Sequence, residues 1–211
     1  MLKIFPITFA VLLSAITLAF SQKADPDVER SLKEIHAAFE AYKKDHDGEY
    51  PPLARTTESG ERELWPEMLK PYLQDTSEAG KVDVSGPFFT PYTPVSERRS
   101  GSVATISFGY NRFGLGRDGG GKEEGIRFPV RNVPEPDATI LLVEVDSPKQ
   151  QGSGWYAAWC DPAFDFQRYE GMAHVLYASG RVAVVPPGAL LVADFPATPL
   201  APWFGDLSKN P

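Results

Sequence analysis

Residues 25–46 read DPDVERSLKEIHAAFEAYKKDH and carry the pattern of an amphipathic helix. Asp25 is placed to cap this helix, and Pro26 suits its first position because an N–H there would have no partner within the helix. Apolar residues recur at spacings of four and three, which puts them on one stripe. They are Val28, Leu32, Ile35, Phe39 and Tyr42. We therefore predict a helix from Pro26 to about His46 that packs this stripe against another element.

Glycine and proline end this helix. Gly48 is a natural C-cap, and the prolines at 51–52 prevent the helix from continuing. Residues 53–60 have the composition of a loop. A short second helix is predicted over about residues 64–71, with Pro66 in its first turn.

Four short runs in the second half of the chain have the pattern of strands, because they are rich in β-branched or aromatic residues and bounded by Gly, Pro or Asp. These runs are residues 105–110, 139–145, 173–178 and 181–185. Ser179 and Gly180 alone separate the last two runs, which is typical of a tight hairpin. We predict an α+β fold in which the helix stripe covers one face of a small antiparallel sheet. The 20 Pro and 18 Gly residues predict long irregular loops.

An apolar run precedes the predicted helix. Lys3 supplies a short positive start, residues 4–20 are largely apolar, and small residues stand at Ala19 and Ser21. This pattern predicts a signal peptide that is cleaved before Gln22. The competing interpretation is an uncleaved membrane anchor, because the run nearly reaches the ~20 residues that span a bilayer.

Length and charge fit one compact domain. The 211 residues carry 28 acidic and 21 basic side chains, a formal charge of −7. This balance argues against nucleic acid as a partner, since phosphate binding needs clustered Lys and Arg. Cys160 is the only cysteine, which excludes a disulfide within the chain. We divide the chain into a leader, residues 1–21, an α+β domain, residues 22–186, and an irregular Pro-rich tail, residues 187–211.

Acidic side chains gather where the first helix is predicted to end. Asp45, Asp47 and Glu49 offer carboxylate oxygens, the ligands that calcium prefers. Their spacing departs from that of the EF-hand loop, and acidic residues are common in solvated turns. We expect a turn that ends the helix and keep calcium at these residues as the alternative; no other cofactor is expected.

Other patterns linked to chemistry are weak. Residues 114–119 formally match Gly-x-Gly-x-x-Gly, but two further glycines follow where a dinucleotide-binding fold needs a helix, so we expect a loop. His36 and His46 are ten residues apart and face different sides of a helix, which disfavours a zinc pair.

No Gly-x-Ser-x-Gly motif occurs. Carboxylates that a hydrolase would need are scattered without a spacing rule: Glu144, Asp146, Asp161, Asp165 and Glu170. We predict no catalytic residues, although a triad assembled only in space stays open.

Two segments share features with one group of proteins. In the first, residues 32–42 are followed by Asp45-His46-Asp47-Gly48-Glu49-Tyr50-Pro51. This is similar to the end of the helix in type IV pilins and to the turn that leaves it. The second segment, residues 168–182, has the register of a prepilin-like group whose C-terminal motif is His, nine residues, then Asp-Gly. Tyr169 stands where that His is expected, and Ser179 stands where the Asp is expected.

The chain thus resembles type IV pilin-like and type II secretion pseudopilin-like proteins over most of residues 28–186. The resemblance implies an exported, non-enzymatic structural or interaction module with a pilin-like head, associated with a type II secretion or type IV pilus apparatus. Its partners would be proteins of that assembly, in the periplasm, at the cell surface or outside the cell. The Gly-Phe-Thr-Leu-x-Glu processing site of prepilins is missing. The long hydrophobic helix of the pilus core is also missing, so a soluble or singly anchored head is implied, with residues 4–20 as its membrane tether if the leader is kept.

Two alternatives stay open. The first is a cell-surface module that binds a glycan or a protein through residues 114–124 or through the aromatic residues 155–166. The second is a secreted hydrolase that uses the scattered carboxylates.

Overall fold

The computed structural model describes residues 23–93, 98, 101–112, 115–116, 122–123, 126–127, 130–133, 135–145, 157–158 and 169–186. The predicted leader, the Pro-rich tail, Cys160 and the carboxylates Asp146, Asp161 and Asp165 lie outside the described residues. Within the described ranges, no helix combines the length and the apolar character needed to cross a membrane.

Helix α2, Pro26–Asp45, confirms the predicted amphipathic helix. The side chain of Asp25 caps it, because Oδ1 accepts hydrogen bonds from the N–H groups of Asp27 at 2.8 Å and Val28 at 3.3 Å. The predicted stripe is buried, with Val28, Leu32, Ile35 and Phe39 at 0% exposure and Tyr42 at 4%. The C-cap is His46 rather than the predicted Gly48. Gly48 has φ +82° and donates its N–H to the carbonyl of Lys43.

A hairpin replaces the loop that we predicted over residues 53–60. Strand β1, Ala54–Thr56, pairs antiparallel with β2, Arg62–Leu64. Hydrogen bonds between Thr57 and Glu61 close the turn. The composition of residues 53–60 gives no sign of this pairing. Helix α3, Trp65–Leu73, follows directly and confirms the second predicted helix.

Five of the remaining described strands form one sheet in the order β7-β3-β6-β8-β9. Its strands are β3 (Phe108–Asn111), β6 (Ile140–Glu144), β7 (Ala157–Ala158), β8 (Ala173–Tyr177) and β9 (Val182–Val185). The pairs β3–β6, β6–β8 and β8–β9 are antiparallel, and β7 lies parallel to β3. Strands β4, Lys122–Glu123, and β5, Ile126–Arg127, form a separate antiparallel pair. The predicted α+β class and the β8–β9 hairpin are therefore confirmed.

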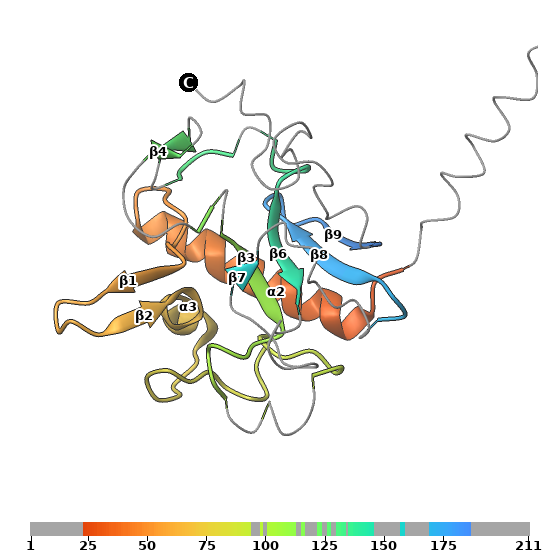
Figure 1. Cartoon of the computed structure of the whole chain (residues 1–211), viewed down its shortest axis with the longest axis horizontal. Helices are drawn as coiled ribbons and strands as arrows, with labels where there is room; N and C mark the ends of the chain where they lie inside the picture. Colours follow the sequence, from red (N-terminus) through yellow and green to blue (C-terminus); the bar gives the residue numbers. More distant parts are fainter. Residues whose placement is uncertain are drawn as a thin grey trace, which may run out of the picture.

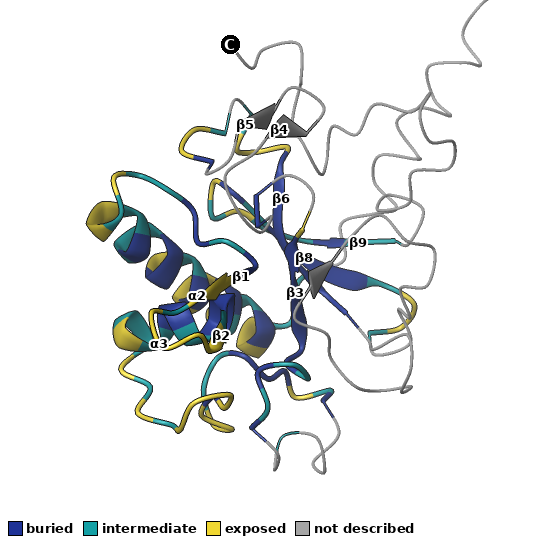
Figure 2. Cartoon of the chain, turned by 60° about the vertical axis from the view of Figure 1, so that its left-hand side comes forward, coloured by how far each residue is buried: buried dark blue, intermediate teal, exposed yellow. Residues whose placement is uncertain are grey.

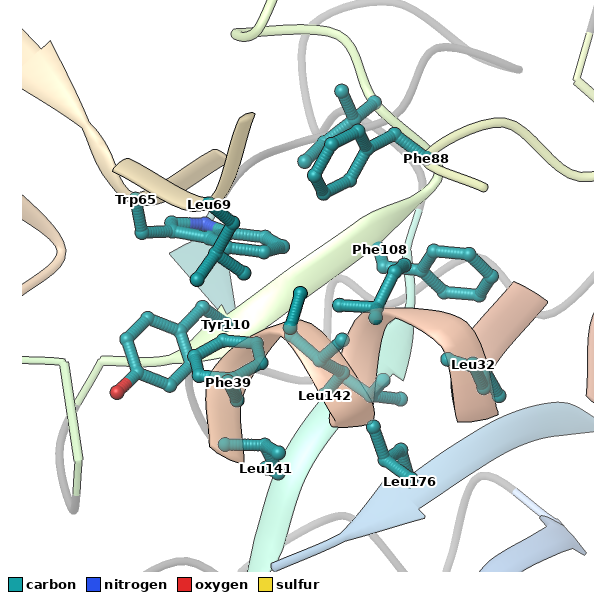
Figure 3. Packing of buried hydrophobic residues seen from close by; sticks show 14 of the residues in the cluster. Leu32, Phe39, Trp65, Leu69, Phe88, Phe108, Tyr110, Leu141, Leu142 and Leu176 are labelled. Carbon is teal, nitrogen blue, oxygen red and sulfur yellow. The ribbon is translucent and has the colours of Figure 1, made fainter. Parts of the chain in front are cut away.

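Both helices lie on the same side of the five-stranded sheet, as Figure 2 shows. Helix α2 runs across this face and contacts β8 and β9 (Figure 1). Aromatic side chains fill the space where α2, α3 and β3 meet (Figure 3). The ring centroid of Phe39 is 5.5 Å from that of Trp65 and 5.2 Å from that of Tyr110. The stripe that defines the helix in the sequence is thus the centre of the core.

Candidate functional site

Five polar side chains gather where α2 begins. We call Asp25, Tyr92, Glu144, Tyr169 and His174 the joint cluster, because they connect the start of the helix to the sheet. Asp25 is the helix cap, Glu144 ends β6, and His174 lies in β8. Tyr92 comes from the segment after α3, and Tyr169 directly precedes the last hairpin.

The pair of His174 and Glu144 is the centre of this cluster. Nδ1 of His174 lies 2.8 Å from Oε2 of Glu144, and the two side chains are 0% and 4% exposed. Nε2 of His174 lies 3.1 Å from the backbone nitrogen of Asp25. Because a backbone N–H only donates, Nε2 must accept and carries no proton. Nδ1–H therefore donates to Glu144, which fixes the imidazole as the neutral Nδ1–H tautomer.

A layer of hydroxyl groups lies next to the carboxylate. The hydroxyl of Thr90 donates to Oε1 of Glu144 at 3.4 Å, and the N–H of Thr90 donates to Oγ of Ser107 at 2.9 Å. The Ser107 hydroxyl also contacts that of Thr93. The guanidinium of Arg98 donates to the carbonyls of Thr90 and Thr93. Thr90 and His174 thus bind the buried carboxyl group of Glu144 in place of water, and Ser107, Thr93 and Arg98 bind the Thr90 segment.

Two tyrosines hold the chain just before the helix. The hydroxyl of Tyr92 donates to Oδ2 of Asp25 at 2.8 Å, and the hydroxyl of Tyr169 donates to the carbonyl of Lys23 at 3.1 Å. The bond from Tyr92, followed by the N–H bonds of the helix start, lowers the pKa of Asp25. Burial and the neighbouring carboxylate raise the pKa of Tyr92. Residues 23–25 are thus attached to elements more than 65 residues away in the sequence.

A buried His–carboxylate pair is also found in catalytic sites, where the carboxylate orients the ring and the second nitrogen faces a substrate. In this structure that second nitrogen accepts from the Asp25 N–H instead. Both nitrogens of His174 have protein partners, and the ring is enclosed. The arrangement therefore suits attachment of the helix start to the sheet.

The sequence does not reveal this cluster. There Glu144 is only one of several scattered carboxylates, and His174 matches no motif. The sheet brings them together, because Val143 pairs with Val175 and the next position on each strand places Glu144 beside His174. The one available signal is a charged residue at the end of an apolar strand, since such residues are rarely buried without a partner.

The predicted calcium residues have other partners in this structure. Asp45 accepts a hydrogen bond from the Tyr72 hydroxyl at 3.0 Å, and Oε1 of Glu49 accepts from the guanidinium of Arg131 at 2.5 and 3.0 Å. Asp47 has φ +52° in the turn. Among the described residues, no three His, Cys, Asp or Glu side chains are grouped to hold a metal ion. The turn at the helix end agrees with prediction, and calcium stays an untested alternative.

Only Leu115 and Gly116 of the glycine motif fall within the described residues. The N–H of Gly116 donates to the carbonyl of Asn111 at 2.9 Å, and its carbonyl accepts from the N–H of Leu53. A Cβ at Gly116 would overlap the ring of Tyr110. This glycine therefore permits close packing of the backbone on an aromatic ring.

The other two histidines lie at separate places along α2. Nε2 of His36 donates to the carbonyl of Ala178 at 3.1 Å, next to the β8–β9 turn. The ring of His46 stacks on Tyr42 with centroids 3.7 Å apart.

Comparisons of the chain with protein-family models, with curated proteins and with solved structures found no match.

Proposed function

We propose that this chain is an exported, non-enzymatic pilin- or pseudopilin-like module that acts through protein contacts in a type II secretion or type IV pilus assembly. The observation that carries the proposal is the position of α2. Only residues 22–25 separate this helix from the predicted leader. Its apolar stripe lies on a mostly antiparallel sheet built from the second half of the chain.

The joint cluster supports this proposal. Only residues 21 and 22 separate the end of the apolar run from Lys23, whose carbonyl is bound by Tyr169. The three residue steps from residue 20 to Lys23 span at most about 11 Å. If the leader is kept, the domain would therefore be held close to the membrane surface in a restricted orientation. A module that presents one face to an assembly benefits from such a short connection.

The burial of Glu144 is consistent with a non-enzymatic role. This carboxylate was among the acids that a secreted hydrolase would use, and here it is 5% exposed and bound to His174 and Thr90. A general acid must reach the proton acceptor on its substrate. Glu144 has no such access in this arrangement.

Two measurements test the proposal. The first is the mass of the chain recovered from the producing organism and from its medium. A start at Gln22 would indicate a released module, and an intact leader would indicate a tethered head. The second compares secreted proteins and surface filaments in cells with and without the gene.

We expect loss of the gene to reduce secretion or filament number, and the intact gene to restore it. Unchanged secretion and filaments in the deletion strain would contradict the proposal. Turnover of a polysaccharide or peptide by the purified chain, abolished by changing one acid, would replace it with the hydrolase alternative.

A further inference from the structure

We propose that His174 makes the attachment of residues 23–25 sensitive to pH, so that a proton on its Nε2 atom releases the start of α2 while the sheet stays folded. The inference stands on the contacts of the joint cluster and does not depend on the proposed function.

The hydrogen bond between Asp25 and His174 exists only for a neutral ring. Nε2 accepts the Asp25 N–H at 3.1 Å, and an imidazolium has no lone pair to accept with. A proton on Nε2 would also face the positive end of the helix dipole. Histidine is the side chain that ordinarily changes charge between about pH 5 and about pH 8. A proton on Nε2 therefore removes the bond that ties the helix start to β8.

The neighbours of His174 in the sheet determine whether the ring or the helix start moves when Nε2 gains a proton. Glu144 on β6 binds Nδ1 at 2.8 Å and retains that bond when the ring is charged. Val184 is paired with His174 on the β9 side and offers no charge. The ring is therefore held from within the sheet, and the helix start is the part that gives way.

The charges of the helix start belong mostly to other pairs. Asp27 pairs with Arg30 at 2.8 Å, and Glu29 pairs with Lys33 at 2.6 Å, on the exposed side of α2. The Asp25 carboxylate is the anion of this element that interacts with His174. Its oxygens cap the helix and accept from Tyr92. Its attraction to an imidazolium opposes release, so the loss of the Nε2 bond must outweigh this attraction.

The tyrosines complete the surroundings. The ring centroid of Tyr169 lies 4.5 Å from that of His174, and the ring centroid of Tyr92 lies 5.6 Å from that of Tyr169. Both hydroxyls bind the segment that would be released, at Asp25 and at Lys23. Lys23 is exposed and Asp25 is half-buried, whereas His174 is fully enclosed. Release of residues 23–25 therefore exposes few apolar groups and leaves the core in place.

Nuclear magnetic resonance of the ¹⁵N-labelled full chain tests the inference. The ring nitrogens of His174 report its proton, and the Asp25 amide reports the bond. Between about pH 8 and about pH 5 we expect exchange protection of the Asp25 amide, corrected for intrinsic exchange, to fall at least about fivefold. This is the ratio that loss of one hydrogen bond of about 1 kcal/mol produces. Amides of Val175 and Leu176 should keep their protection.

Two variants make the test specific. His174→Gln keeps a donor and an acceptor but does not titrate, so protection of the Asp25 amide should no longer depend on pH. His36→Gln is the matched control, because His36 also joins α2 to the last hairpin but contacts it at Ala178, beyond the other end of β8. This variant should keep the wild-type pH dependence at Asp25.

Glu144→Gln serves if His174→Gln does not fold. It removes the negative charge beside the imidazolium, so half-release should move to lower pH. The inference is overturned if Nε2 gains its proton while Asp25 stays protected. It is also overturned if the pH dependence persists in His174→Gln, or if half-release does not move down in Glu144→Gln.

Discussion

Replacement of Gly180 by alanine tests whether the last hairpin rests on α2. Gly180 closes the β8–β9 turn with φ +86°. A Cβ at this position would lie 2.9 Å from Cε1 and 3.0 Å from Nδ1 of His36, closer than real Cβ atoms approach a ring. The substitution therefore strains the turn and pushes the histidine of the helix away.

The expected cost has two parts. A left-handed backbone conformation costs a residue with a Cβ roughly 1–2 kcal/mol. Moving His36 breaks the hydrogen bond from Nε2 to the carbonyl of Ala178, which contributes about 1 kcal/mol. Gly180→Ala should therefore lower the free energy of unfolding by about 2–3 kcal/mol.

Urea denaturation followed by circular dichroism measures this change. Gly171→Ala is the matched control, because Gly171 has φ +80° but a Cβ added there would have no atom within 4 Å. It should cost only the backbone part, roughly 1–2 kcal/mol. In a His36→Ala background, Gly180→Ala should also lose only the backbone part. The double-mutant cycle should then give a coupling of about 1 kcal/mol between the two positions.

Equal losses of stability in Gly180→Ala and Gly171→Ala, or a cycle that gives no coupling with His36, would contradict this contact. Either result would mean that the helix and the hairpin turn do not touch in solution. The packing of the α2 stripe on this sheet, and the pilin comparison that depends on it, would then be wrong.

Three further changes probe the core, the helix cap and the acidic turn. Phe39→Ala should lower the free energy of unfolding by about 3–5 kcal/mol in urea, because it removes a fully buried ring from an aromatic cluster; a loss below about 1 kcal/mol would place the ring outside the core. The Tyr92 bond lowers the pKa of the N-cap carboxylate, so the stability it provides is present above the ordinary value of 3.8 and is lost as pH falls below it. Tyr92→Phe should reduce urea stability at neutral pH and flatten its decline in acid, whereas an unchanged pH profile would argue against the bond. Millimolar calcium should leave the melting temperature unchanged, because Asp45 and Glu49 already have protein partners; a rise that Asp47→Asn abolishes would establish the calcium alternative.

The helix and the last hairpin were predictable because each is specified by neighbouring residues. The helix needed only the spacing of its apolar side chains and the cap at Asp25. The hairpin needed only two apolar runs and Gly180 between them. The hairpin at β1–β2 was missed because its strands are three residues long and largely polar on the exposed side. Short polar segments of this kind have the composition of a loop, so we predicted a loop there.

The joint cluster was beyond prediction for a different reason. Asp25 and His174 are 149 positions apart, and Glu144 lies 30 positions from His174. No local pattern records such a contact, because it depends on the order β6-β8 and on the register between these strands. Tertiary placement alone distinguishes this buried carboxylate from the other acids around it in the sequence.

His174 in β8 and His36 in α2 together explain how α2 is held near the two ends of β8. His174 accepts from the backbone at the start of the helix, and His36 donates from within the helix to Ala178 just beyond the strand. Apolar packing of the stripe is non-directional and would allow the helix to slide or rotate on the sheet. Hydrogen bonds at two separated points fix its position, because each requires a particular donor and acceptor to meet. Since both bonds involve β8 or the residue just beyond it, the position of α2 depends on where β8 lies in the sheet.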